Sequence, residues 1–178
     1  MSFRWVGRPF VPAGNPRKRA ALALSLLVLG GCGGGGTPAA KAVQGTGYRF
    51  SAPADWVVTR SGREVQASQG VRLVSVTRYP LLRAYRPALW ARVVPELDGA
   101  AAQLAKQQSG DVGGSQTVTV AGQRARRYDI DYQRNGKALV ERIAFVLRGK
   151  TEYLLLCRYD RGGNTDACDR LLATFTLG

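Results

Sequence analysis

The sequence predicts an α+β domain in which helices cover an antiparallel β-sheet of about six to seven strands. Three observations lead to this prediction. Short segments of alternating apolar and polar residues follow one another from Gly47 onward, as in strands with one buried face. Segments of helical composition interrupt and close this series, at 87–108 and after Asn164. The dipeptide Asn135-Gly136 separates two strand segments and favours a tight hairpin, because both residues tolerate positive φ.

The first predicted strands precede Pro80. Pro53 ends a short strand, which resumes at Trp56. Gly70 lies in a polar turn between two longer segments, and this arrangement predicts a hairpin. Pro80 ends the last of these strands because proline has no N–H group to donate to a sheet. We expect one strand at 48–51 that resumes at 56–58, and two further strands at 64–67 and 71–79.

Residues 87–108 predict the first helix. Leu97, Ala101 and Leu104 recur at helical spacing and should face the core. Pro95 should open the main stretch of this helix at its first position, where the missing N–H group costs nothing.

The remaining chain predicts four strands and a closing helix. A turn at 148–150 should join the last two strands. Asn164 or Thr165 should cap the helix, and Asp166 and Asp169 lie in its first turn, where negative charge is favourable against the helix dipole. The strands are expected at 116–120, 123–133, 138–147 and 151–159, and the apolar stripe of the helix comprises Ala167, Cys168, Leu171, Leu172 and Phe175.

One of these strands conflicts with simple alternation. An orientation that turns Tyr128 and Ile130 toward the core also turns Arg124 and Arg126 inward, and a buried Arg without a partner is costly. A β-bulge near Arg126 would turn Ala125 inward instead and release both Arg side chains.

The N-terminal segment predicts export and lipidation. Basic residues precede an apolar run at 20–29, which is too short for a membrane span and typical of a signal peptide. The sequence Leu29-Gly30-Gly31-Cys32 resembles the lipobox of bacterial prolipoproteins. This resemblance implies that the lipoprotein signal peptidase recognises these residues, that cleavage follows Gly31, and that the Cys32 sulfur carries fatty acids such as palmitate. The alternative is an ordinary secretory signal that leaves Cys32 as a free thiol.

The predicted precursor therefore has three parts. Residues 1–31 are the signal peptide, 32–46 are the lipidated Cys and a flexible Gly-rich tether, and 47–178 are the folded domain. The lipid should hold the domain on the extracytoplasmic side of the cell membrane, or in the outer membrane if the host has one.

Two cysteines remain for the folded domain, Cys157 and Cys168. In an oxidising compartment such a pair is expected to form a disulfide. Closing so short a loop would stabilise the fold by about 3 kcal/mol on the chain-entropy model. The alternative is a pair of buried free thiols, and the spacing disfavours a redox site of the Cys-x-x-Cys type.

The charge of the chain is strongly positive. The net charge is +14, and five of the 26 basic residues precede Cys32, which leaves +9 from Cys32 onward. A positive field attracts polyanions, so anionic wall polymer and lipid head groups are candidate ligands, although solvated surface charge explains the excess equally. Nucleic acid is not an expected partner of an exported chain. Histidine is absent, which excludes Ser-His-Asp and Cys-His catalysis and His-ligated metals.

The order of segments resembles the PsbP-like family, which includes the DcrB-type and other small envelope lipoproteins. This resemblance implies an αβα sandwich with an antiparallel sheet between helices. It also implies an assembly factor, adaptor or other binding module without a shared catalytic set, so it assigns no active-site residue. The resemblance spans nearly all of 47–177 and depends on four segments: Phe50-Ser51-Ala52-Pro53-Ala54-Asp55-Trp56, Val118-Thr119-Val120-Ala121-Gly122-Gln123-Arg124-Ala125, Tyr153-Leu154-Leu155-Leu156 and Leu171-Leu172-Ala173-Thr174-Phe175.

Carboxylates on the long strand segments form one candidate site. Asp129 and Asp131 lie about 7 Å apart on one strand face, with Glu141 on the next strand. Three carboxylates could bind Ca²⁺ or perform acid–base chemistry. Arg127 and Arg142 are near them, so ordinary cross-strand ion pairs explain the same residues.

Arg124, Arg126 and Arg127 form a second candidate site, which could bind an anion because guanidinium groups match phosphate oxygens. The two tryptophans of the domain, Trp56 and Trp90, are interpreted as packing residues and not as ligand stackers.

The leading functional hypothesis is a non-enzymatic, lipid-tethered binding or accessory module with a protein partner in the envelope and no cofactor or metal. One alternative is a hydrolase that uses Asp129, Asp131 or Glu141. Another is a receptor for anionic wall polymer or lipid head groups.

Overall fold

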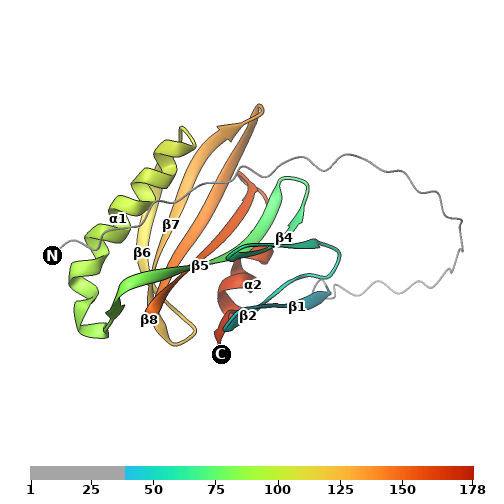
Figure 1. Cartoon of the computed structure of the whole chain (residues 1–178). Coiled ribbons are helices and arrows are strands. Elements are labelled where there is room, and N and C mark those ends of the chain that lie inside the picture. The colour runs from blue at the N-terminus through green and yellow to red at the C-terminus, as the bar shows by residue number, and fades with distance from the viewer. Residues whose placement is uncertain (1–38) are drawn as a thin grey trace, which may run out of the picture.

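The fold is α+β, as the sequence predicts, in a computed structural model that describes residues 39–178. A small sheet has the strand order β1-β2-β9, and a larger sheet has the order β3-β4-β5-β8-β7-β6. Figure 1 shows both sheets and the two helices. The strands are β1 (Ala40–Gly45), β2 (Tyr48–Pro53), β3 (Val57–Ser61), β4 (Glu64–Gln69), β5 (Arg72–Tyr85), β6 (Asp111–Val120), β7 (Gln123–Arg134), β8 (Lys137–Asp160) and β9 (Thr176–Leu177). The helices are α1 (Trp90–Gln107) and α2 (Asp166–Thr174), and a 3₁₀ turn, η1 (Pro87–Leu89), precedes α1.

The folded part begins earlier than predicted. β1 lies within 32–46, for which we expected a tether, and all of its residues pair with β2. Val43 is the anchor of this strand, because its side chain is only 2% exposed and joins the core. A strand with one fully buried apolar residue leaves a weak sequence pattern. The signal peptide at 1–31 and Cys32 lie outside the described residues.

β8 contains the hairpin predicted at 148–150. The Arg161 N–H group donates to the Ala138 carbonyl oxygen at 2.9 Å. Arg158 binds Glu141 at 2.5 Å, although a sequence separation of 17 would span about 56 Å in a straight strand. β8 therefore folds back near Gly149, whose φ of 55° suits a tight turn. One arm pairs with β7 and the other with β5, so both arms lie at the centre of the larger sheet.

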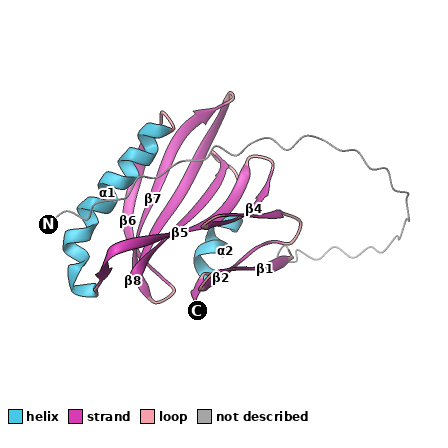
Figure 2. Cartoon of the chain, in the orientation of Figure 1, coloured by secondary structure: helices cyan, strands magenta, loops and turns pink. Residues whose placement is uncertain are grey.

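Both faces of the larger sheet are covered, as expected for an αβα sandwich. α1 packs on one face, and α2 packs with the small sheet on the other (Figure 2). Neighbouring residues of β8 belong to different cores, since Phe145 packs in the cluster under α1 and Val146 in the cluster under α2. Neither helix of the described part is long and apolar enough to cross a membrane.

α1 has the predicted core face but a different start. Leu97, Ala101 and Leu104 are buried, as expected. The helix begins at Trp90, so Pro95 lies inside it and not at its first position. Pro95 cannot donate to the carbonyl group of Ala91, and both residues are exposed, so water can hydrate that carbonyl group.

α2 is attached to the sheet by a disulfide. Cys157 on β8 and Cys168 on α2 form the predicted pair, with their Cα atoms 5.3 Å apart. Both side chains are buried, at 2% and 1% exposed. Thr165 occupies the cap position of the helix, and the Asn164 side-chain oxygen accepts from the Asp166 N–H group at 2.6 Å. The covalent bond thus fixes the start of α2 on the central strand.

Removing the disulfide should lower the stability of the domain. We expect the double variant Cys157→Ala/Cys168→Ala to lose about 2–4 kcal/mol of unfolding free energy, because the unfolded chain regains the freedom that the closed loop removes. Urea denaturation of the variant and of the reduced wild type should give similar midpoints below that of the oxidised wild type. An unchanged midpoint in both would show that the bond does not stabilise the fold.

Candidate functional site

The three candidate carboxylates do not form one site. In the register between β7 and β8, Asp129 faces Arg142 and Ile130 faces Glu141. Residues paired in this way point to the same side of the sheet, so Glu141 lies on the face opposite to Asp129 and Asp131. The expectation of a three-carboxylate site is therefore wrong.

Asp129 is held by Arg142 on the face that α2 covers. Arg142 Nε donates to Asp129 Oδ1 at 2.9 Å, and Nη2 donates to Oδ2 at 3.3 Å. Arg142 Nη1 also reaches Asp169 of α2 at 3.3 Å. Its guanidinium group lies 5.8 Å from the centre of the Tyr159 ring. The hydrogen bonds to Asp129 raise the pKa of Arg142, so the positive charge is fixed at this position.

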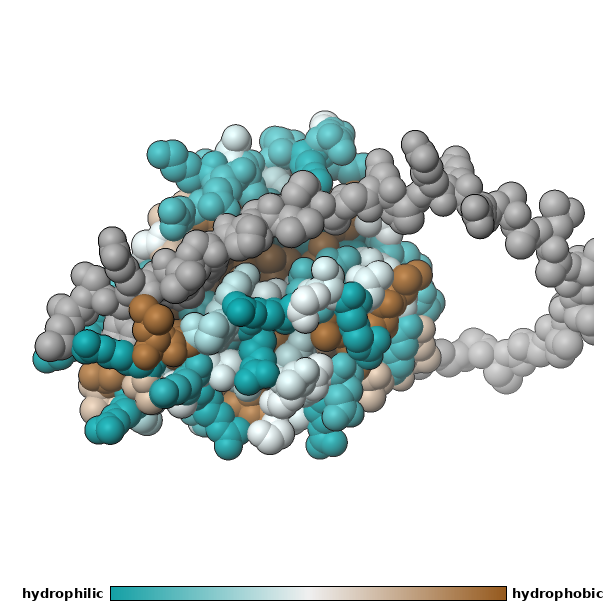
Figure 3. Space-filling view, viewed as in Figure 1, coloured by the Kyte–Doolittle hydropathy of each residue, from teal (hydrophilic) through white to brown (hydrophobic). Residues whose placement is uncertain are grey.

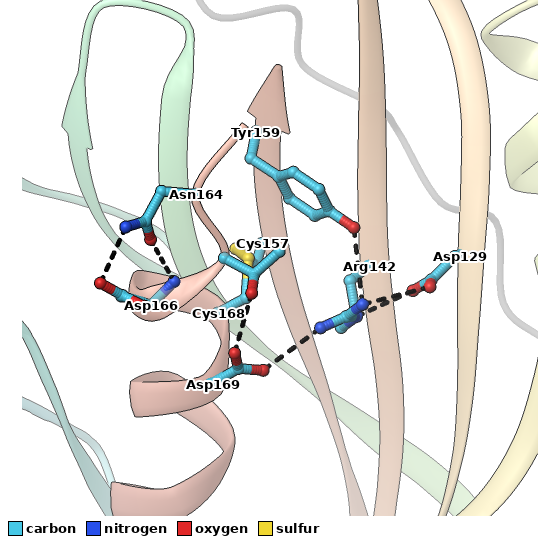
Figure 4. Close-up of polar contacts among 9 residues, drawn as sticks. Asp129, Arg142, Cys157, Tyr159, Asn164, Asp166, Cys168 and Asp169 are labelled. Carbon is cyan, nitrogen blue, oxygen red and sulfur yellow. Dashed lines mark hydrogen bonds and ion pairs between the residues drawn. A yellow bond between two sulfur atoms is a disulfide. The ribbon is translucent and has the colours of Figure 1, made fainter. Parts of the chain in front are cut away.

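Figure 4 shows how this network joins three elements. Arg142 points from β8 toward Asp129 on β7 and toward Asp169 on α2, next to the Cys157–Cys168 disulfide. The cross-strand pairs that the sequence offered as the simpler explanation are thus present in the fold.

Asp131 is paired as well. Its Oδ1 atom lies 2.7 Å from Nη2 of Arg161, whose side chain is 56% exposed. Within the described range 39–178, no group of three or more His, Cys, Asp or Glu side chains is arranged to hold a metal ion.

Glu141 is buried under the end of α1. It is 2% exposed and accepts from Arg158, from the Tyr132 hydroxyl at 3.1 Å and from the Gln108 amide at 2.5 Å. Burial and the neighbouring Glu141 charge raise the pKa of Tyr132. This carboxylate is therefore a fully committed acceptor inside the domain and is not placed to take a proton from a substrate.

The three arginines of the second candidate site also separate. Arg126 faces α1 and binds Asp98 at 3.1 Å, whereas Arg127 points to the other face, where its strand neighbour is Gln116. Arg124 is exposed at the start of β7. The structure does not bring these three guanidinium groups together at one anion.

The expected bulge near Arg126 is absent, because the pairing of β7 with β8 is unbroken from Ala125 to Arg134. Both faces of the sheet are covered, so Ala125 is buried on one face while Arg126 enters the other. Asp98 of α1 makes this possible, since it pairs with Arg126 and also accepts from the Tyr128 hydroxyl at 2.6 Å. Burial is the main reason for the raised pKa of Tyr128, and the hydrogen bond to Asp98 adds to it.

Asp98 is a residue that the sequence analysis missed. It lies at helical spacing from Val94, Ala101 and Ala105, so it is a carboxylate within the apolar face of a helix. That position is a signal for a partner on the opposing element.

A small pocket lies where α2 meets β2 and β5. It has a volume of ≈ 190 Å³ and is lined by Trp56, Arg72, Asp166 and the disulfide, among others. Pockets for drug-sized ligands usually have volumes of about 300–1,000 Å³, so this one suits at most a side chain or an ion. Trp56 is 4% exposed and belongs to the core, as expected. Trp90 is half-buried and packs against the cluster under α1.

The comparisons with known proteins show a fold and not a family. No family model and no curated protein matches the chain. Among solved structures, the cyanobacterial PsbP of Synechocystis sp. PCC 6803 superposes with a TM-score of 0.56 at 14% identity, over 84% of this chain and 99% of that protein. A protein of Bacteroides thetaiotaomicron gives 0.55 at 11% identity over 74% of this chain, which spans 45% of that protein. LpqN of Mycobacterium tuberculosis, described as involved in cell envelope biogenesis, gives 0.47 at 13% identity, over 78% of this chain and 90% of that protein. The chain therefore has a PsbP-like fold.

The buried pair of Glu141 and Arg158 should stabilise the fold only as a pair. We expect Glu141→Gln and Arg158→Met each to cost about 3 kcal/mol or more, because each leaves a buried group without its counter-charge. The double variant should cost less than the sum of the two, since no isolated charge remains. Chemical denaturation of all four proteins measures this coupling.

The matched control is Arg161→Gln, which breaks the more exposed pair with Asp131 and should cost less than about 1 kcal/mol. Additive losses in the Glu141 and Arg158 variants would contradict a coupled buried pair.

Proposed function

We propose that this chain is a lipid-anchored accessory protein of the bacterial cell envelope, which acts by binding and not by catalysis. The observation that carries the non-catalytic part is the commitment of the candidate carboxylates to arginines. Asp129, Asp131 and Glu141 each bind a guanidinium group within the fold. A carboxylate whose oxygen atoms bind a guanidinium group within the fold is poorly placed to reach a substrate proton.

The anchor is supported by the sequence at Cys32. Leu29-Gly30-Gly31-Cys32 follows a short apolar run, and the segment after it begins the folded part at Ala40. Two or three acyl chains contribute about 0.8 kcal/mol for each buried CH₂ group, which is enough for stable attachment. A folded domain placed close to the membrane by such a lipid can meet partners that are themselves confined to the envelope.

The fold supports a role as a binding module. Both faces of the larger sheet are used for packing, so surfaces for partners are found at the ends of the strands, on the helices and on the small sheet. The PsbP-like resemblance in the order of sequence segments implies an adaptor or assembly factor, and the observed architecture agrees with that resemblance in fold.

Replacement of Cys32 should release the protein from the membrane. We expect Cys32→Ala to move the chain from the membrane fraction to the soluble extracytoplasmic fraction, because the thioether to the lipid cannot form. Mass spectrometry of the wild-type N-terminus should find acylated Cys32 as the first residue. Cys168→Ala is the matched control and should stay in the membrane fraction. An unmodified Cys32 thiol in the membrane fraction would contradict the proposed anchor.

Affinity capture from crosslinked membranes tests the accessory role. We expect the wild type to capture the same protein partner in repeated experiments. The Asp131→Ala variant should capture that partner too, because the proposed function gives this carboxylate no catalytic role. Reproducible recovery of no partner would contradict a protein-binding role.

A further inference from the structure

Three stretches that are distant in the sequence meet at one end of the domain. These are the stretch from the end of β5 to the start of α1, the turn between β6 and β7, and the reversal of β8 near Gly149 (Figure 1). Tyr85 links these stretches. It pairs with Gly149 of β8, and its hydroxyl group lies close enough to Arg124 to feel that charge, which partly offsets the rise in the Tyr85 pKa caused by burial. Leu89 and Trp90 pack against the same cluster as Leu147.

This end is positively charged and contains no acidic residue in its segments. Residues 83–95, 121–128 and 143–151 contain no Asp or Glu. The name basic end is used here for six exposed side chains on these segments: Arg83, Arg86, Arg92, Arg124, Arg148 and Lys150.

The fold does not explain this concentration of charge. Arg86, Arg92, Arg148 and Lys150 form no salt bridge with another residue of the described part. Arg92 lies in the first turn of α1, which has no acidic residue there, so its charge opposes the helix dipole. Like charges gathered in this way repel one another and destabilise the compact state. An external anion would offset that repulsion.

Apolar surface accompanies the charge. The side chain of Leu82, next to Arg83 on β5, is 64% exposed. Leu81 and Trp90 are partly exposed as well. In the space-filling view, hydrophobic surface lies beside hydrophilic side chains in the region where β5 ends (Figure 3). Exposed leucine with a nearby tryptophan and several arginines is the combination that suits the boundary between lipid head groups and acyl chains.

We propose that the basic end docks on the surface of an anionic phospholipid bilayer, with Leu82 entering the boundary below the head groups. The charges would neutralise lipid phosphates. A soluble anionic polymer would satisfy the arginines but would not provide an apolar layer for Leu82. Cys32 is eight residues from Ala40, a distance of at most about 29 Å, so an anchored domain would remain within reach of the bilayer.

The inference deepens the proposed function by naming a surface that the domain touches, and its test does not need the anchor. The probe protein is the chain from Gly33 to Gly178, which lacks Cys32. Every described strand pairing, both cores and the disulfide lie within it. Circular dichroism and thermal unfolding verify the fold of each variant before binding is measured.

Co-sedimentation with vesicles of phosphatidylglycerol and phosphatidylcholine measures binding. We expect the wild type to bind these vesicles, to lose affinity as salt is added, and not to bind vesicles of phosphatidylcholine alone. The variant Arg86→Gln/Arg148→Gln/Lys150→Gln should bind about 100-fold more weakly, because each basic residue near an anionic surface contributes about 1 kcal/mol. Leu82→Ser should bind about tenfold more weakly, since it loses the apolar contact.

The matched control removes the same charge elsewhere. Lys106, Arg134 and Lys137 are exposed at the other end of α1 and of the long strands, and their replacement by Gln should change the affinity by less than about threefold. Equal losses in the two triple variants would overturn the proposal, because binding would then follow net charge alone. Absence of binding to the anionic vesicles would overturn it too. The proposal would also be overturned if Leu82→Ser bound as tightly as the wild type and soluble polyphosphate abolished the binding of both. That result would indicate a surface for polyanions in general.

Failure of this assay would leave the lipid anchor untouched, because the anchor is tested by fractionation of Cys32→Ala in cells. Failure of the anchor would leave the vesicle result unchanged, since the probe protein has no Cys32.

Discussion

The larger sheet is covered on both faces, and this cover constrains the charged residues in the middle of its central strands. A charged side chain in the middle of β7 or β8 points toward a protein layer on either face, whereas those at the strand ends, such as Arg124 and Arg148, remain exposed. Asp129 meets Arg142, Glu141 meets Arg158, and Arg126 meets Asp98. The cost of an isolated charge would be greatest for Glu141, which is 2% exposed, whereas Asp98 and Asp129 are partly exposed partners of mostly covered arginines.

These pairs also determine how the layers are joined. Arg142 extends from β8 to Asp169 on α2, and the disulfide adds a covalent link between the same two elements. On the other face, Asp98 connects the middle of α1 to Arg126, and Gln108 connects its end to Glu141. Hydrogen-bonded pairs are directional, whereas apolar packing is not, so they fix the rotation and position of each helix on the sheet.

Some charged residues of the domain are paired within the fold, and others are exposed at its surface. The candidate carboxylates Asp129, Asp131 and Glu141 are each engaged by an arginine on β8 or directly after it. The chain has more than twice as many basic as acidic residues, so most of its positive charge has no acidic partner to meet. Part of this excess lies at the basic end, where three stretches of the chain bring it next to exposed apolar surface. A surface of that composition is suited to a charged and partly apolar partner.

The sequence by itself determined the α+β class, the hairpins at Asn135-Gly136 and near Gly149, the core face of α1 and the pairing of Cys157 with Cys168. These features depend on local periodicity, turn chemistry and the number of cysteines, which neighbouring residues specify. Only the tertiary structure decided that Ala40–Gly45 is a strand, that Arg126 enters a core without a bulge, and that Glu141 lies on the face opposite to Asp129. Each of these depends on a partner supplied by a distant segment, such as β2 for β1 and Asp98 for Arg126, and on a register whose shift by one residue would exchange the two faces. A local pattern contains no information about that partner, so the sequence could name the candidate side chains but not their neighbours.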